Sequence, residues 1–258
     1  MGKTLHLHVG LPKCGSSSLQ AYLIRLRPKL LDQGYDYLDI SDSSTGNLTP
    51  YVKSLSPGGG DIVFRHFNSG RSTENASDEL FAAIDASPAP NLILSAESVA
   101  KRRRTHDFRE ITDRFETVQV HLALRPRVEW VVSHYAQGIK TGKYRGPLET
   151  FLQSPRFQDH VVPMLTFADH FSYWQDRVGP EYLHLHFAGS RFPSMVDQFL
   201  SAIGLQSKQE MEPAGRRNQS PSAFVLSALA TVRRQNRAQF LKVQKKIIRL
   251  AERLDPSP

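Results

Sequence analysis

The order of a strand, a glycine-containing loop and a helix at the start of the chain constrains the fold most. Residues 4–9 alternate like a β-strand and end at Gly10, while residues 16–31 place leucines at helical spacing. The loop between them runs from Gly10 to Gly15. Backbone N–H groups at the start of such a helix, together with the helix dipole, attract phosphate groups. This order predicts an α/β protein with an anion site at the end of its first strand.

Strand and helix patterns then alternate along the chain. Short apolar segments at 91–95, 118–124 and 181–187 predict buried strands. Such alternation is typical of βαβ units, so we expect a P-loop-like three-layer fold with a central parallel sheet flanked by helices. Ligands bind such sheets beyond the carboxyl ends of the strands. The helices that we expect are 74–86, 97–115, 128–139, 148–152, 161–178 and 194–203.

Two segments stand apart from this alternation. Residues 40–62 are rich in serine, glycine and proline, and a connection of this length predicts a functional lid or a mobile segment. We expect residues 40–70 to become ordered when ligands bind. Residues 222–258 contain eight basic and two acidic side chains, and so contribute +6 to the net charge of +8. We expect an α/β domain over 1–221 and a basic helical extension over 222–258. The extension is either a solvated helix face or a contact for nucleic acid or an anionic surface.

The composition excludes several classes of protein. A single cysteine, Cys14, excludes an internal disulfide and a multi-cysteine zinc site. No apolar run approaches the roughly 20 residues of a transmembrane helix, and the first residues lack the apolar region of a signal peptide. We therefore expect a cytoplasmic protein without a transmembrane segment.

The loop after the first strand is close to a Walker A motif but departs from it. Gly10 and Gly15 have the required spacing, yet Ser16 follows where that motif has lysine, and the lysine lies inside the loop as Lys13. The usual magnesium partner, an acid that ends a neighbouring apolar strand, is also missing directly after the apolar residues 92–94. These departures disfavour an ATP- or GTP-hydrolysing enzyme. They still leave a loop suited to a phosphate, with Lys13 as its positive charge.

Residues 12–19, Pro-Lys-Cys-Gly-Ser-Ser-Ser-Leu, resemble the 5′-phosphosulfate loop of sulfotransferases. These enzymes use 3′-phosphoadenosine 5′-phosphosulfate (PAPS), and their pattern is Pro-Lys-x-Gly-Thr/Ser-Thr/Ser-x-Leu. The resemblance implies that the loop stabilises the leaving 5′-phosphate without a metal, with Lys13 as a catalytic residue. The residues that it implies in binding PAPS here are Lys13, Cys14, Gly15, Ser16, Ser17 and Ser18.

A second motif resembles the 3′-phosphate site of the same family. Arg125 follows the strand 118–124, and Ser133 lies eight positions further along, about two turns into the next predicted helix. The guanidinium fork of an arginine suits a phosphate, and the serine would add a hydroxyl. Arg216 and Arg217 resemble the arginine-rich loop that covers the nucleotide, although a basic surface loop would look the same. The resemblance spans about residues 4–222 and is greatest to bacterial carbohydrate-type sulfotransferases.

Sulfuryl transfer also needs a general base for the acceptor. Glu97 follows the strand 91–95 at the expected edge of the sheet, but an acid at a helix start would serve the dipole equally well. His66 follows the glycine-rich segment, and its imidazole suits proton abstraction near neutral pH. The choice between Glu97 and His66 stays open. His6 and His8 share one face of the first strand, where we expect them in the core.

We therefore expect a PAPS-dependent sulfotransferase that transfers a sulfuryl group to a hydroxyl or amine of a small-molecule or carbohydrate acceptor. Two alternatives stay open at this point. One is a P-loop nucleotide kinase with a rearranged loop, and the other is a nucleotide-binding protein without catalytic activity. The sequence identifies neither the acceptor nor the oligomeric state.

Overall fold

The computed structural model describes residues 2–38, 74–95, 109–189 and 191–205. The lid expected over 40–62, most of the helix expected over 97–115 and the basic extension over 222–258 lie outside these residues. The elements are β1 (Thr4–His8), α1 (Ser16–Leu31), β2 (Tyr35–Tyr37), α4 (Glu74–Ala86), β3 (Asn91–Ser95), α5 (Arg109–Thr112), β4 (Thr117–Leu124), α6 (Arg127–Lys140), α7 (Leu148–Leu152), α8 (Pro155–His160), η3 (Val162–Met164), α9 (Phe167–Val178), η4 (Pro180–Tyr182), β5 (Leu183–Phe187) and α10 (Met195–Ala202).

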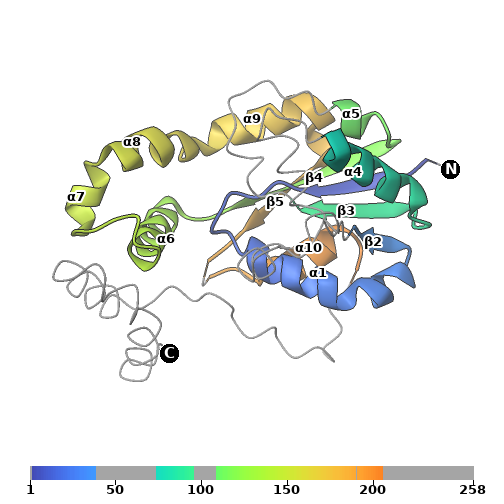
Figure 1. The fold of residues 1–258 in the computed structure, drawn as a ribbon, viewed down its shortest axis with the longest axis horizontal. Helices are drawn as coiled ribbons and strands as arrows, with labels where there is room; N and C mark the ends of the chain where they lie inside the picture. The colour runs from blue at the N-terminus through green and yellow to red at the C-terminus, as the bar shows by residue number, and fades with distance from the viewer. Residues whose placement is uncertain (1, 39–73, 96–108, 190, 206–258) are drawn as a thin grey trace. The chain divides into compact units, whose positions relative to one another are not determined.

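The described strands form one parallel sheet in the order β2-β3-β1-β4-β5 (Figure 1). Helices α1 and α10 lie on one face, and α4, α5 and α9 lie on the other (Figure 1). This arrangement confirms the predicted fold class of a parallel sheet flanked by helices. The chain passes from one side of β1 to the other between β3 and β4, so the carboxyl ends of β1 and β4 flank the switch point of the sheet. Open α/β sheets bind their ligands at such a point.

The two faces of the sheet carry different side chains. Successive residues of a strand point to opposite faces, and paired residues of parallel neighbours point to the same face. The face toward α1 and α10, which we call the histidine face, carries His6, His8, His121, His184 and His186. The opposite face, which we call the aliphatic face, carries Leu5, Leu7, Leu92, Leu94, Val120 and Leu122.

Two of the predicted elements are wrong in their extent, and two were missed. A single helix over 161–178 does not form, because Pro163 enters the 3-10 turn η3 and the helix α9 begins only at Phe167. Proline lacks the N–H that a helix interior needs, which ends the regular pattern there. The strand expected over 181–187 begins at Leu183, after the 3-10 turn η4. The short strand β2 and the helix α8 were not predicted.

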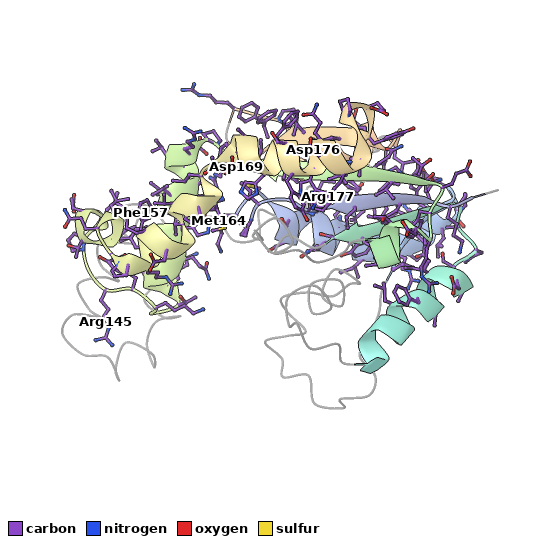
Figure 2. All side chains as sticks on the ribbon, turned by 90° about the horizontal axis from the view of Figure 1, so that it is seen from above. Arg145, Phe157, Met164, Asp169, Asp176 and Arg177 are labelled. Carbon is purple, nitrogen blue, oxygen red and sulfur yellow. The ribbon has the colours of Figure 1, made fainter. Side chains whose placement is uncertain are left out.

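Helix α9 carries both a buried aromatic side chain and exposed charged side chains. Trp174 is buried in α9, which contacts β4, while Asp169, Asp176 and Arg177, all labelled in Figure 2, are exposed. The guanidinium of Arg177 lies 3.4 Å from the centre of the Tyr173 ring, which is within the range of a cation–π contact. This division of polarity is the pattern of a surface helix on a sheet.

The chain divides into two compact units, Met1–Arg125 with Phe167–Arg217 and Pro126–Thr166 with Asn218–Pro258. The sheet belongs to the first unit. In the second unit, Phe151 is buried and contacts Tyr135, Tyr144 and Phe157 through its ring. Figure 2 labels Phe157 and Met164, both of which are buried. Among the described helices of either unit, none combines the length and the apolar character that crossing a bilayer requires.

Candidate functional site

The loop between β1 and α1, residues 9–15, is held along β4 by its backbone. The N–H of Val9 donates to the carbonyl of His121 at 3.0 Å, and the N–H of Leu11 donates to the carbonyl of Ala123 at 2.9 Å. These bonds continue the sheet pairing beyond the last residue of β1. The β1–α1 loop is therefore fixed on a strand of the sheet rather than suspended in solvent, and its turn lies at the switch point.

Two residues of this loop have left-handed backbone conformations. Lys13 has φ of 72° and Gly15 has φ of 94°. A side chain at position 15 would be strained at this φ, and its Cβ would lie 3.1 Å from Cβ of Met195 in α10. Gly15 is thus required both by the turn and by the close approach of α10. Lys13 adopts a conformation that few residues other than glycine adopt, and such strain concentrates at ligand sites.

Helix α1 begins directly after this turn, and no negatively charged side chain of its first turn balances the positive end of its dipole. Gly15 supplies no side-chain cap, and the first turn of α1 contains no acidic residue. The hydroxyl of Ser16 is nearly fully buried, at 1% exposure of the residue, and its Oγ has no hydrogen-bond partner within the described chain. A buried hydroxyl without a partner is costly. An anion at this helix start would supply both the negative charge and an acceptor.

Arg125 is brought to this loop from the end of β4. Its Nη1 donates to the carbonyl oxygen of Lys13 at 3.2 Å, across 112 positions of sequence. The bond joins the loop after β1 to the residue after β4, which are the two sides of the switch point. The guanidinium of Arg125 therefore contacts the backbone of the loop that carries Lys13. The sequence did not predict that Arg125 also holds the loop itself.

Cys14, Ser17 and Ser18 differ in which of their groups a ligand could contact. The side chain of Cys14 is buried, and its Sγ lies 3.9 Å from the carbonyl oxygen of Pro12. Cys14 can therefore offer a ligand its backbone N–H but not an exposed thiol. Ser17 is exposed and Ser18 is half-buried, so both lie where the first turn of α1 meets solvent.

The other predicted site residues lie in the second unit or outside the described residues. Ser133 lies in α6 of the second unit, where it is mostly buried. Its neighbour Tyr135 donates to the carbonyl of Gly146 at 2.8 Å, which is a structural use of that hydroxyl. Glu97, His66, Arg216 and Arg217 lie outside the described residues, so their roles stay predictions.

Comparison with known proteins gives one informative likeness. A crystal structure of a sulfotransferase from Alicyclobacillus acidocaldarius is similar with a TM-score of 0.50 and 16% sequence identity, and the match covers 90% of this chain and 93% of that one. No protein-family model and no curated protein matches the chain. The protein therefore has a distant, sulfotransferase-like fold.

Proposed function

We propose that the protein is a sulfotransferase that uses PAPS and transfers its sulfuryl group to a hydroxyl or amine, with a carbohydrate among the candidate acceptors. The hydrogen bond that joins Arg125 to Lys13 is the observation that carries this proposal. It joins the guanidinium of Arg125 to the backbone of the loop that carries Lys13, and these two residues match two separate phosphate-binding patterns of sulfotransferases. The sulfotransferase-like fold supports the same proposal.

The residues present fit a 5′-phosphosulfate group. The start of α1 has neither an acidic residue nor a side-chain cap, and the buried Oγ of Ser16 needs a partner. These features match an anion with several acceptor oxygens. Lys13, Ser16, Ser17 and Ser18 would hold this group together with the backbone N–H groups of Cys14 and Gly15.

PAPS would supply the sulfuryl group and a good leaving group in its 5′-phosphate. Negative charge grows on that phosphate as the sulfur–oxygen bond breaks, by analogy with phosphoryl transfer. Lys13 and the first amides of α1 stabilise this charge in our proposal, which makes them the groups that act on the transition state. Arg125 is assigned to the 3′-phosphate, as is Ser133 from the sequence motif, and Arg216 and Arg217 are assigned to cover the nucleotide.

The acceptor proton needs a base, and our proposal assigns it to Glu97 with His66 as the second candidate. Glu97 comes two positions after Ser95, the last residue of β3, which is the strand beside β1. A carboxylate there would start from the same edge of the sheet as the β1–α1 loop. Glu97→Gln keeps the shape of the side chain but cannot accept the proton.

Nucleotide binding tests the cofactor first. The protein should bind adenosine 3′,5′-bisphosphate by calorimetry without magnesium, which a nucleotide kinase would not be expected to do. Arg125→Ala should weaken this binding by about 1.5–3 kcal/mol, because a charge-assisted hydrogen bond is lost. Binding of 5′-AMP, which has no 3′-phosphate, should weaken less, by only what the lost bond to the Lys13 carbonyl contributes. Lys29→Ala, at an exposed lysine in the last turn of α1, is the matched control. Equal losses for both nucleotides would reject the assignment of Arg125.

Turnover then tests the chemistry, in a screen of acceptors with labelled PAPS. Lys13→Ala should lower turnover by about 10²–10³ while nucleotide binding weakens far less, because its charge acts on the transition state. Glu97→Gln should lower turnover by about 10²–10⁴, with His66→Asn the milder change. The reverse order would transfer the role of base to His66. Nucleotide binding without turnover of any acceptor would favour a protein without catalytic activity.

A further inference from the structure

A buried hydrogen-bond network lies behind the β1–α1 loop and is not used by the proposed chemistry. His8 is the last residue of β1 and has no exposed surface. Its Nδ1 lies 2.9 Å from Oγ of Ser95, the last residue of β3. The same Oγ accepts a hydrogen bond from Nε2 of Gln20, in α1, at 3.0 Å. Three elements that surround the loop, β1, β3 and α1, therefore meet at one hydroxyl.

The network restrains both the position and the orientation of the His8 ring. A serine hydroxyl has one hydrogen to donate and can accept two hydrogen bonds. Ser95 can therefore serve Gln20 and His8 at once, whichever tautomer the ring adopts. Burial and the nearby His186 lower the pKa of His8 to about 3, so the ring is neutral in the folded protein. A neutral ring hydrogen-bonded to Ser95, whose hydroxyl is itself held by Gln20, has little freedom to move.

The Nε2 and Cε1 atoms of the His8 ring lie against the start of the loop. A Cβ added to Gly10 would lie 2.7 Å from Nε2 and 3.0 Å from Cε1 of His8. Gly10 is not in the left-handed region, so the ring rather than the backbone angle requires glycine there. Nε2 has no hydrogen-bond partner within the described residues. The Nε2–Cε1 edge of the ring thus acts on the loop by shape, while the neighbouring atom Nδ1 is anchored to Ser95.

We propose that His8 is a positioning residue for the phosphate-binding loop, anchored by Ser95 and Gln20 and packed against Gly10. The network would hold the loop, the first turns of α1 and the end of β3 at fixed distances from one another. The consequence for ligands rests on the proposed function, since it assumes that the loop binds the 5′-phosphosulfate. The effect on the loop itself does not depend on that assumption.

The first test compares two buried serines in the full chain. Ser95→Ala removes the hydroxyl at the centre of the network. Ser87→Ala is the matched control, because Ser87 is also buried and donates to Asp36 at 2.7 Å, but it precedes β3 instead of ending it. Both variants should lose a similar amount of stability toward urea. Only Ser95→Ala should speed hydrogen exchange at residues 10–18, by about tenfold, the equivalent of one hydrogen bond.

Ligand binding gives the second readout, with adenosine 3′,5′-bisphosphate as the probe. Ser95→Ala should raise its dissociation constant by about tenfold, while Ser87→Ala should leave it unchanged. If the unmodified protein binds no nucleotide, the proposed function fails, yet the exchange experiment still decides the role of the network. Equal exchange rates in the two variants would overturn the positioning role.

A double-mutant cycle isolates the contact between the ring and the loop. Gly10→Ala should disturb the loop strongly, because the added Cβ meets the buried ring of His8. His8→Asn keeps a polar atom near the position of Nδ1 but removes Nε2 and Cε1. The effect of Gly10→Ala on loop exchange should therefore be at least about tenfold smaller in the His8→Asn background, which is a coupling beyond simple additivity. Additive effects of the two substitutions would contradict the proposed contact.

Discussion

The two faces of the sheet are built by the same strands, yet they are stabilised in different ways. On the aliphatic face, Leu7 and Leu122 are buried by packing alone, and no protonation state is involved. On the histidine face, Nδ1 of His6 lies 3.3 Å from Nε2 of His121, and Nδ1 of His121 lies 3.0 Å from Nε2 of His186. One face depends on shape only, whereas the other depends on shape and on protons.

Each hydrogen bond between the histidine rings pairs one N–H with one bare ring nitrogen. Protonation of both rings of a pair would place two N–H groups against each other. Burial is the main cause that lowers the pKa of His6 to about 4 and of His186 to about 4, with a further contribution from His184 in both cases. Burial also places the pKa of His121 well below its usual value. The same face holds His8 behind the β1–α1 loop, and burial is also the main cause that lowers the pKa of His8 to about 3.

The largest expected effect is a loss of stability in acid. Below the ordinary histidine pKa of 6.5, the unfolded chain binds protons that the folded histidine face does not. The free energy of unfolding therefore decreases as the pH is lowered, until the folded rings titrate near pH 4. Each such ring contributes about 1.4 kcal/mol per pH unit, so His6, His8 and His186 together predict about 4 kcal/mol between pH 6 and 5. Urea unfolding at pH 7, 6 and 5 measures this slope. A flat profile would contradict neutral buried rings.

A substitution on the aliphatic face should change stability without changing that slope. Leu122→Ala removes buried methyl groups from a fully buried position and should cost about 2–5 kcal/mol at pH 7. Leu122 lies on the face opposite the five histidines of the sheet, so the unfolding free energies of variant and parent should differ by the same amount at pH 7 and at pH 6. A slope that changes with Leu122→Ala would show that the two faces are coupled.

Removing one ring from the histidine face should change mainly the slope. His186→Leu has a similar volume, but it takes away one of the groups whose pKa is lowered on folding. The dependence of the unfolding free energy on pH should become shallower by about 1.4 kcal/mol per unit between pH 6 and 5. The same urea series measures it. An unchanged slope would mean that His186 is protonated in the folded protein.

The smallest expected effect concerns a hydroxyl at the edge of the histidine face. Tyr35 donates from its hydroxyl to the carbonyl of Ile203 at 2.6 Å, and its ring lies against His6. Tyr35→Phe keeps the ring and removes this bond between β2 and the end of α10, so stability should fall by about 1 kcal/mol. The pH slope should stay as it is, because no histidine is altered. Thermal unfolding at pH 7 compares variant and parent.

Sequence patterns predicted correctly those helices and strands whose hydrophobic residues follow a single helical or strand pattern along the whole segment. The helix expected over 16–31 forms as Ser16–Leu31, and the strand expected over 91–95 forms as Asn91–Ser95. The prediction was wrong at 161–178, where Pro163 interrupts an otherwise helical pattern. It missed β2, because three residues are too few to show a period.

For the candidate site, the sequence supplied the residue types but not their partners. The motifs selected Lys13 and Arg125 for their charge and position, while the hydrogen bond between them was not foreseen. His8 was correctly expected in the core. Its link through Ser95 to Gln20 was missed, because the three residues lie on three different elements.

The sequence by itself determined the order of strand, loop and helix and the alternation of side chains across each strand. These follow from short-range sterics and from hydrophobic periodicity, both of which act within one element. Only the tertiary structure decided that β1 lies between β3 and β4. That neighbourhood places Ser95 beside His8, 87 positions away, and Arg125 beside Lys13, 112 positions away. Contacts over such separations depend on how the helices pack on the sheet, which no local pattern records.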